Sequence, residues 1–146
     1  MFSSFDTSAS GLTAQRLRMD VISDNIANVN TTRTEEGEPY RRKLPVFQQK
    51  KGSDFSRVFR GELNRNKRDV GQGVKVSGIV EDESPLERAY RPEHPDADEE
   101  GYVSLPNVDV ATEMVDMIEA SRAYEANITA LDTTKNMALQ AIQIGG

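Results

Sequence analysis

The side chains best suited to metal or acid chemistry lie in one short stretch, residues 94–101 of this 146-residue chain. Asp96, Asp98 and Glu100 alternate there, and alternating carboxylates followed by a glycine are typical of calcium-binding loops. The spacing then fails, because position twelve counted from Asp96 is Asn107, where such loops carry a bidentate glutamate. We therefore interpret the stretch as an acidic surface loop and expect no metal site.

The sequence offers few other parts for catalysis. It has no cysteine and one histidine, His94, which excludes thiol nucleophiles, disulfides and histidine-rich metal sites. His94 lies close to two prolines, and we interpret it as a turn residue. The chain shows no Gly-x-Ser-x-Gly elbow and no phosphate-binding glycine loop. We expect a protein that is not an enzyme and that uses no cofactor.

The composition predicts one domain with a thin core. Leu, Ile, Val and Phe make up about 22% of the chain, just above the ~20% below which charged chains usually stay disordered. No apolar run approaches the ~18 residues that a transmembrane helix needs, so we expect no membrane span. The start of the chain also lacks the basic and apolar segments of a secretory signal. These features alone predict a cytosolic protein.

Both ends of the chain carry helical patterns. Near the N-terminus, apolar residues recur in a heptad-like stripe made of Phe5, Leu12, Met19, Ile22, Ile26 and Val29. This stripe predicts an amphipathic helix of about 25 residues. We expect Ser3 or Ser4 to cap it, and we expect it to end within residues 28–32.

The C-terminal pattern is longer. Steps of four and three residues from Val110 select Val110, Met114, Met117, Ser121, Tyr124, Ile128, Leu131, Lys135, Ala138 and Ile142. The acidic residues, Glu113 and Asp116 among them, lie mostly off this stripe. About 35 helical residues would span about 52 Å, too long for a chain of this size to bury alone. The pattern predicts a coiled coil or a helical assembly.

The middle of the chain predicts a small β-rich module with long loops, because residues 31–107 hold all six prolines. Alternating segments at 73–77 and 102–105 predict strands, and a third at 44–47 is weakened by Pro45. Residues 55–59 are ambiguous between a strand and a helical turn. The fold class predicted is therefore α+β.

Charge is segregated along the chain. Residues 40–70 hold ten basic and three acidic side chains, whereas residues 81–100 hold nine acidic and two basic ones. Two solvated loops would explain this pattern, and so would complementarity between neighbouring copies in an assembly. Nucleic-acid binding is a third interpretation, against which the net charge of −6 argues.

Several separated motifs resemble those of bacterial flagellar rod and hook proteins. The N-terminal segments SASGL (8–12) and DNIANVNTT (24–32) resemble the N-terminal signature of that family, and residues 108–127 resemble its C-terminal helix. Residues 31–34, 39–42 and 90–103 are similar to the proximal-rod branch. The resemblance covers both ends and much of the middle, and is loosest over residues 48–72.

The resemblance implies a rod subunit in the flagellar basal body, in the periplasm or cell wall after export. It implies that residues 1–30 and 108–146 pair as one discontinuous coiled-coil domain, with the β-rich residues 31–107 outside it. Copies would pack helically with other rod proteins around a central channel and transmit motor torque. The residues we expect to pack between subunits are Phe5, Leu12, Met19, Ile22, Ile26, Val29, Val110, Met114, Met117, Tyr124, Ile128, Leu131 and Ile142.

The resemblance also assigns smaller roles. Asn25, Asn28, Thr31 and Thr32 fall in the family signature, and we expect the two asparagines to serve the turn at the helix end. Export would use the flagellum's own type III apparatus, and Phe55 and Phe59 could form its recognition motif. The alternative from another class is a cytosolic coiled-coil adaptor or regulator that uses the same stripes for a discrete dimer.

Overall fold

The computed structural model describes residues 2–50 and 72–144. Within them the chain forms two helices and four strands, in the order α1 (Phe2–Ala27), β1 (Lys43–Gln49), β2 (Val74–Glu81), β3 (Glu87–Tyr90), β4 (Tyr102–Leu105) and α3 (Val110–Ile144). The predicted α+β class, with a helix at each end and antiparallel strands between them, is confirmed. The ambiguous segment 55–59 lies outside the described residues.

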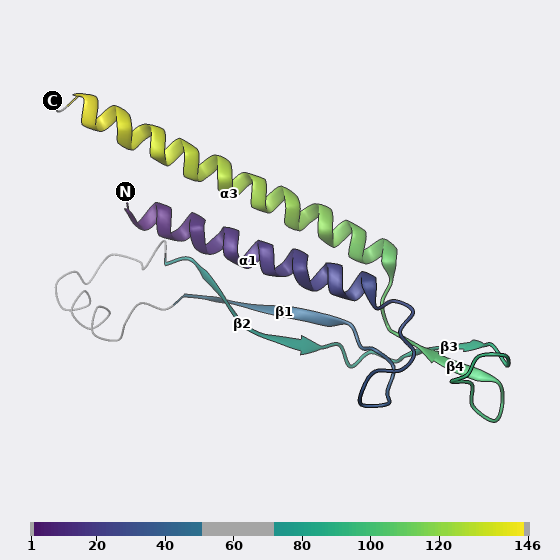
Figure 1. The fold of residues 1–146 in the computed structure, drawn as a ribbon. Helices are drawn as coiled ribbons and strands as arrows, with labels where there is room; N and C mark the ends of the chain where they lie inside the picture. The colour runs from purple at the N-terminus through teal and green to yellow at the C-terminus, as the bar shows by residue number, and fades with distance from the viewer. Residues whose placement is uncertain (1, 51–71, 145–146) are drawn as a thin grey trace, which may run out of the picture.

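The two helices lie side by side in antiparallel directions, with both chain termini at the same end (Figure 1). Their register is fixed by two pairs: Asn25 with Glu113 at one end, and Gly11 with Asn127 farther along. Because α3 has 35 residues and α1 has 26, the C-terminal part of α3 extends past the start of α1.

Small and polar residues form the centre of the contact between the helices. Glu113 and Ala120 on α3 are fully buried, and Asn127, seven residues later, packs against Gly11. Half-buried residues on the same face of α3 alternate with these: Met117, Tyr124 and Leu131. On α1 the buried apolar residues are Ala14, Val21 and Ile22. The core is therefore narrow, in keeping with the low apolar content.

The end of α1 and the start of α3 are marked by side-chain hydrogen bonds to the backbone. α1 starts at Phe2, so the expected cap at Ser3 or Ser4 is wrong; both serines lie inside the first turn. At its other end, the side-chain Nδ2 of Asn28 donates to the backbone carbonyl oxygen of Asp24 at 2.9 Å. α3 is capped by Asp109, whose Oδ1 accepts the Thr112 backbone N–H at 3.0 Å.

The strands form two separate antiparallel pairs. β1 and β2 make a ribbon, from Lys43 opposite Glu81 to Gln49 opposite Val74, and α1 lies between this ribbon and α3 (Figure 1). Pro45 is accommodated within β1 because each strand of a two-stranded sheet has a free edge. β3 and β4 form a hairpin near the C-terminal end of α1. β3 was not predicted, since its short sequence ERAY has no alternating apolar pattern.

Gly11 permits the close approach of the helices, which predicts the effect of enlarging it. A Cβ at Gly11 would lie 2.7 Å from Asn127 Oδ1. We expect Gly11→Val to lower the free energy of unfolding by about 1–3 kcal/mol through overpacking, measured by chemical denaturation. Asn127→Ala in the same chain should recover most of the loss. Gly78→Val is the matched control, because a Cβ there meets nothing within 4 Å; an equal loss in both glycine variants would contradict the explanation.

Candidate functional site

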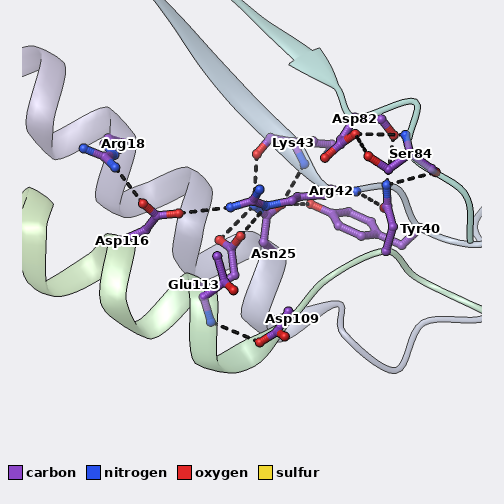
Figure 2. A network of polar contacts seen from close by, with 12 residues as sticks. Arg18, Asn25, Tyr40, Arg42, Lys43, Asp82, Ser84, Asp109, Glu113 and Asp116 are labelled. Atoms are coloured by element: carbon purple, nitrogen blue, oxygen red, sulfur yellow. Dashed lines mark hydrogen bonds and ion pairs between the residues drawn. The ribbon is translucent and has the colours of Figure 1, made fainter. Parts of the chain in front are cut away.

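A buried network of polar side chains joins the C-terminal part of α1, the start of β1 and the first turns of α3 (Figure 2). We call it the polar joint; its members are Arg18, Asn25, Tyr40, Arg42, Glu113 and Asp116. Asn25 and Glu113 are 1% and 0% exposed, so neither side chain can rely on water for its hydrogen bonds. The partners available within the chain must satisfy them.

The side-chain amide of Asn25 pairs with the backbone of Lys43 in the way that a peptide group of a neighbouring strand would. Its Nδ2 donates to the Lys43 carbonyl at 2.9 Å, and its Oδ1 accepts the Lys43 N–H at 2.9 Å. The same amide donates to Glu113 Oε2 at 3.1 Å and accepts the Tyr40 hydroxyl at 3.0 Å. Two donors and two acceptor positions are therefore all occupied. One side chain thus attaches α1 to both β1 and α3.

Charges in the polar joint alternate and balance. Arg42 Nε donates to Glu113 Oε1, and its Nη2 donates to Asp116 Oδ2 at 3.0 Å. The other oxygen of Asp116 accepts Arg18 Nη2 at 2.8 Å. The position of Glu113 near the start of α3 also favours its negative charge, because the helix N-terminus carries partial positive charge. Two guanidinium groups thus neutralise two carboxylates.

Tyr40 closes the polar joint from the side of β1. Its hydroxyl is bonded to Asn25 Oδ1 and to Asp24 Oδ2, at 3.0 and 3.1 Å. Burial raises the pKa of Tyr40 above its ordinary value of 10.0, and the hydrogen bond to Asp24 and that carboxylate's charge raise it further. The phenol therefore remains a neutral donor at physiological pH.

The sequence pattern did not find this network. Glu113 and Asp116 were expected off the apolar stripe, but Glu113 is fully buried and Asp116 is partly buried between two arginines. The reason is that, at every second position of the apolar pattern, the residue that faces α1 is the one just before the position that the pattern selects. Glu113 thus faces α1 where the pattern selects Met114. The seven-residue repeat of Glu113, Ala120 and Asn127 is the signal that could have revealed it.

The four polar residues of the signature segment separate into different roles. Asn28 and Thr31 form the turn after α1, since Thr31 Oγ1 donates to Asn28 Oδ1 at 3.1 Å. Thr32 instead bonds Asp96 Oδ2 at 2.7 Å, which attaches this turn to the β3–β4 hairpin loop. Asn25 lies inside α1 and serves the polar joint rather than the turn.

Asp98 and His94 in the acidic loop, residues 94–101, make hydrogen bonds within the chain. Asp98 Oδ1 accepts the backbone N–H groups of Tyr102 and Glu100, and its Oδ2 accepts Arg88 Nη2. The bond from Tyr102 is the main cause that lowers the pKa of Asp98. His94 Nδ1 accepts the Asp96 backbone N–H at 3.1 Å, a turn contact. In the described part of the chain, no three acidic or histidine side chains converge as metal ligands would.

The residues predicted to pack between subunits fall into two groups. Ile22 is buried within the chain, and Phe5, Leu12, Met19, Ile26, Val29, Met117, Tyr124 and Leu131 are half-buried. The remaining four, on α3, are exposed, and with two neighbours they define the outer stripe: Val110, Met114, Ile118, Ile128, Leu139 and Ile142. Their exposed fractions lie between 38% and 72%. Exposed apolar residues gathered along a helix mark an interaction surface.

Neither described helix combines the length and the hydropathy that crossing a bilayer demands. The outer stripe of α3 is interrupted by Glu125 and Asp132, which favours a protein surface as its environment.

Two protein-family models match the chain. One is described as flagella basal body rod protein and covers residues 5–33; the other is described as flagellar basal body rod FlgEFG protein C-terminal and covers residues 99–144. Together they cover α1 from residue 5 onward, all of α3, and strand β4.

Similar proteins align over almost the whole chain, and three named flagellar basal-body rod protein FlgC illustrate the range. That of Bacillus subtilis is 50% identical, with 99% of this chain and 97% of the relative covered. That of Borreliella burgdorferi is 49% identical with the same coverage, 99% and 97%. That of Escherichia coli is 39% identical, with 97% and 95% covered.

The polar joint predicts an isosteric substitution with a large effect. Asn25→Asp keeps the shape but removes both N–H donors and places a carboxylate against Glu113. We expect it to lower the free energy of unfolding by about 3 kcal/mol at neutral pH, measured by denaturant titration. Asn30→Asp, an exposed position, is the matched control and should change stability by less than about 0.5 kcal/mol. A small effect at Asn25 would show that the network does not hold the segments together.

The raised pKa of Tyr40 predicts how stability changes at alkaline pH. Below pH 10 the phenol is neutral in both states, so its contribution to stability is complete. Above that pH the unfolded chain loses the proton first, and the contribution declines as pH rises toward the higher folded-state pKa. Tyr40→Phe should therefore be less stable than the parent near pH 7, by about 1 kcal/mol, with a difference that shrinks above pH 10. Denaturation at several pH values measures this; a constant difference would contradict it.

Proposed function

The chain belongs to the flagellar basal-body rod protein family and is a structural subunit of that rod, and we propose that it joins the rod by burying the outer stripe of α3 against neighbouring subunits. The observation that carries the proposal is the exposure of large apolar side chains along one helix. Met114 is 56% exposed, Ile118 52% and Leu139 50%. Burying one such side chain fully contributes roughly 1.5–3 kcal/mol.

Family membership decides against the cytosolic adaptor considered from the sequence, and it locates the protein in the flagellar basal body. We extend the structural role to a purely mechanical one, without catalysis. The polar joint supports this extension, because each of its charged groups is engaged by a partner of opposite charge. A rigid connection between α1, β1 and α3 is what a subunit that transmits torque would need.

Three further features belong to the same proposal. Copies would line a central channel together with other rod proteins. The half-buried residues of α1, Phe5 and Leu12 among them, would become fully buried in contacts between subunits. The subunit would reach the basal body through the flagellar export apparatus. Phe55 and Phe59, the candidate recognition motif, lie outside the described residues.

A charge placed in the outer stripe tests the proposal. We expect Ile118→Asp, alone or with Met114→Asp, to remove the protein from isolated hook–basal bodies and to abolish swimming, because a neighbour would have to bury an unpaired carboxylate. Ala130→Asp adds the same charge at an exposed α3 position outside the stripe and should be tolerated better.

Circular dichroism of the purified variants provides the control for folding, since Ile118 is already half exposed in the single chain. Normal swimming together with normal rod content in the Ile118→Asp strain would overturn the proposal.

A further inference from the structure

The β1–β2 ribbon carries a second exposed apolar surface. Leu44 faces Val80 across the strands, and Val46 faces Gly78, so these four residues share one face of the ribbon. Val46 and Val80 are 38% and 48% exposed. The other face at the far end of the ribbon is used, since Val74 and Val76 line a groove with Ala14 and Leu17 of α1.

Nothing among residues 2–50 and 72–144 requires glycine at position 78. Its backbone is not in the left-handed region, so a side chain would be tolerated there, and a Cβ would meet nothing within 4 Å. The adjacent register shift at Val46 and Phe47 does not require glycine for the same reason. Glycine inside a strand weakens it and often marks a bulge, or a site where a ligand or another backbone approaches closely. On this face, Gly78 is the position without a side chain next to the exposed Val46 and Val80, and we call this position the Gly78 notch.

The outer stripe of α3 has the residues to fill this notch. We propose that Ile118 of one copy enters the Gly78 notch on the ribbon of a second copy. Within a single chain this contact is impossible, because α1 lies between α3 and the ribbon (Figure 1). The inference rests on the proposed function, which supplies the assembly, and it names the surface that the outer stripe meets.

Spacing along the two elements supports a definite register. From Ile118 to Met114 is about 6 Å along the helix, and from Gly78 to Val80 is about 7 Å along the strand. In the opposite direction, Glu125 lies about 10.5 Å from Ile118, and Lys75 lies about 10 Å from Gly78. Met114 then meets Val80 while Glu125 meets Lys75.

Charge is complementary in that register. Glu125 and Lys75 are both exposed in the single chain, and neither has a salt-bridge partner among the described side chains. Opposite charges at a contact fix its register more than its strength. Apolar side chains and one ion pair therefore point to the same alignment and to a second copy of this chain.

The contact uses two different surfaces, one on each copy. In a head-to-tail arrangement, each copy keeps its own outer stripe or its own notch free for the next copy. Such an arrangement builds a ring or an open helical series, whereas two copies that exchanged the contact reciprocally would close as a symmetric dimer and give no multimers beyond two.

Cysteine pairing tests the contact directly, because the native chain has no cysteine. In hook–basal bodies isolated from cells that express Gly78→Cys/Ile118→Cys, mild oxidation should give a ladder of multimers of this chain on a non-reducing gel. Each single-cysteine variant is the control and should give no ladder. Absence of a ladder, or linkage only to a different protein, in basal bodies that contain the chain would overturn this contact and leave the proposed function standing.

A charge exchange tests the register independently of cysteine chemistry. Lys75→Glu and Glu125→Lys should each reduce the amount of the chain in basal bodies several-fold, whereas the double variant should restore it. Equal loss in the double variant, with normal folding by circular dichroism, would overturn the register. Loss of the chain from basal bodies in every strain, the unaltered one included, would instead count against the proposed function.

Discussion

The carboxylate of Glu113 has no contact with solvent, and its need for donors on both oxygens determines how three distant segments meet. Asn25 supplies one donor from α1, and Arg42, the residue before β1, supplies the other; they lie 88 and 71 residues away along the chain. A buried carboxylate without these partners would cost several kcal/mol. At this end of the helix pair, the register of α1 on α3 and the attachment of the chain before β1 therefore depend on one side chain.

Such a joint specifies geometry without using much apolar surface. Replacing a buried ion pair by apolar residues is often neutral or stabilising, so ion pairs contribute little to net stability. Only six apolar or aromatic residues are buried among the described residues; two of them are alanines, and one is Tyr40 of the polar joint. The single chain is thus held in a definite arrangement by directional contacts, while much of its large apolar surface stays on α3 and the ribbon.

The sequence predicted the positions of the helices and strands more accurately than it predicted which faces of them are buried. Heptad spacing located α1 and α3, and alternation located β1, β2 and β4, because local periodicity is visible in a single sequence. It misplaced Glu113, since an acidic residue beside an apolar stripe normally faces solvent, and only the distant Arg42 and Asn25 make its burial possible. It could not show the notch at Gly78 either, because a glycine that lacks neighbours is recognised only once its surroundings are known.

The distribution of contacts explains why a chain with so little apolar content can serve as a subunit. Hydrogen bonds and ion pairs depend on direction, so they can fix a monomer's shape before any neighbour arrives. Apolar burial scales with area and has no preferred direction, which suits contacts formed when copies come together. If Met114 and Ile118 turned toward α1 in place of Glu113, the monomer would gain core and lose the surface it needs for assembly. Because the polar contact face and the apolar stripe of α3 are offset by one residue, one face of the helix serves folding and another stays available for assembly.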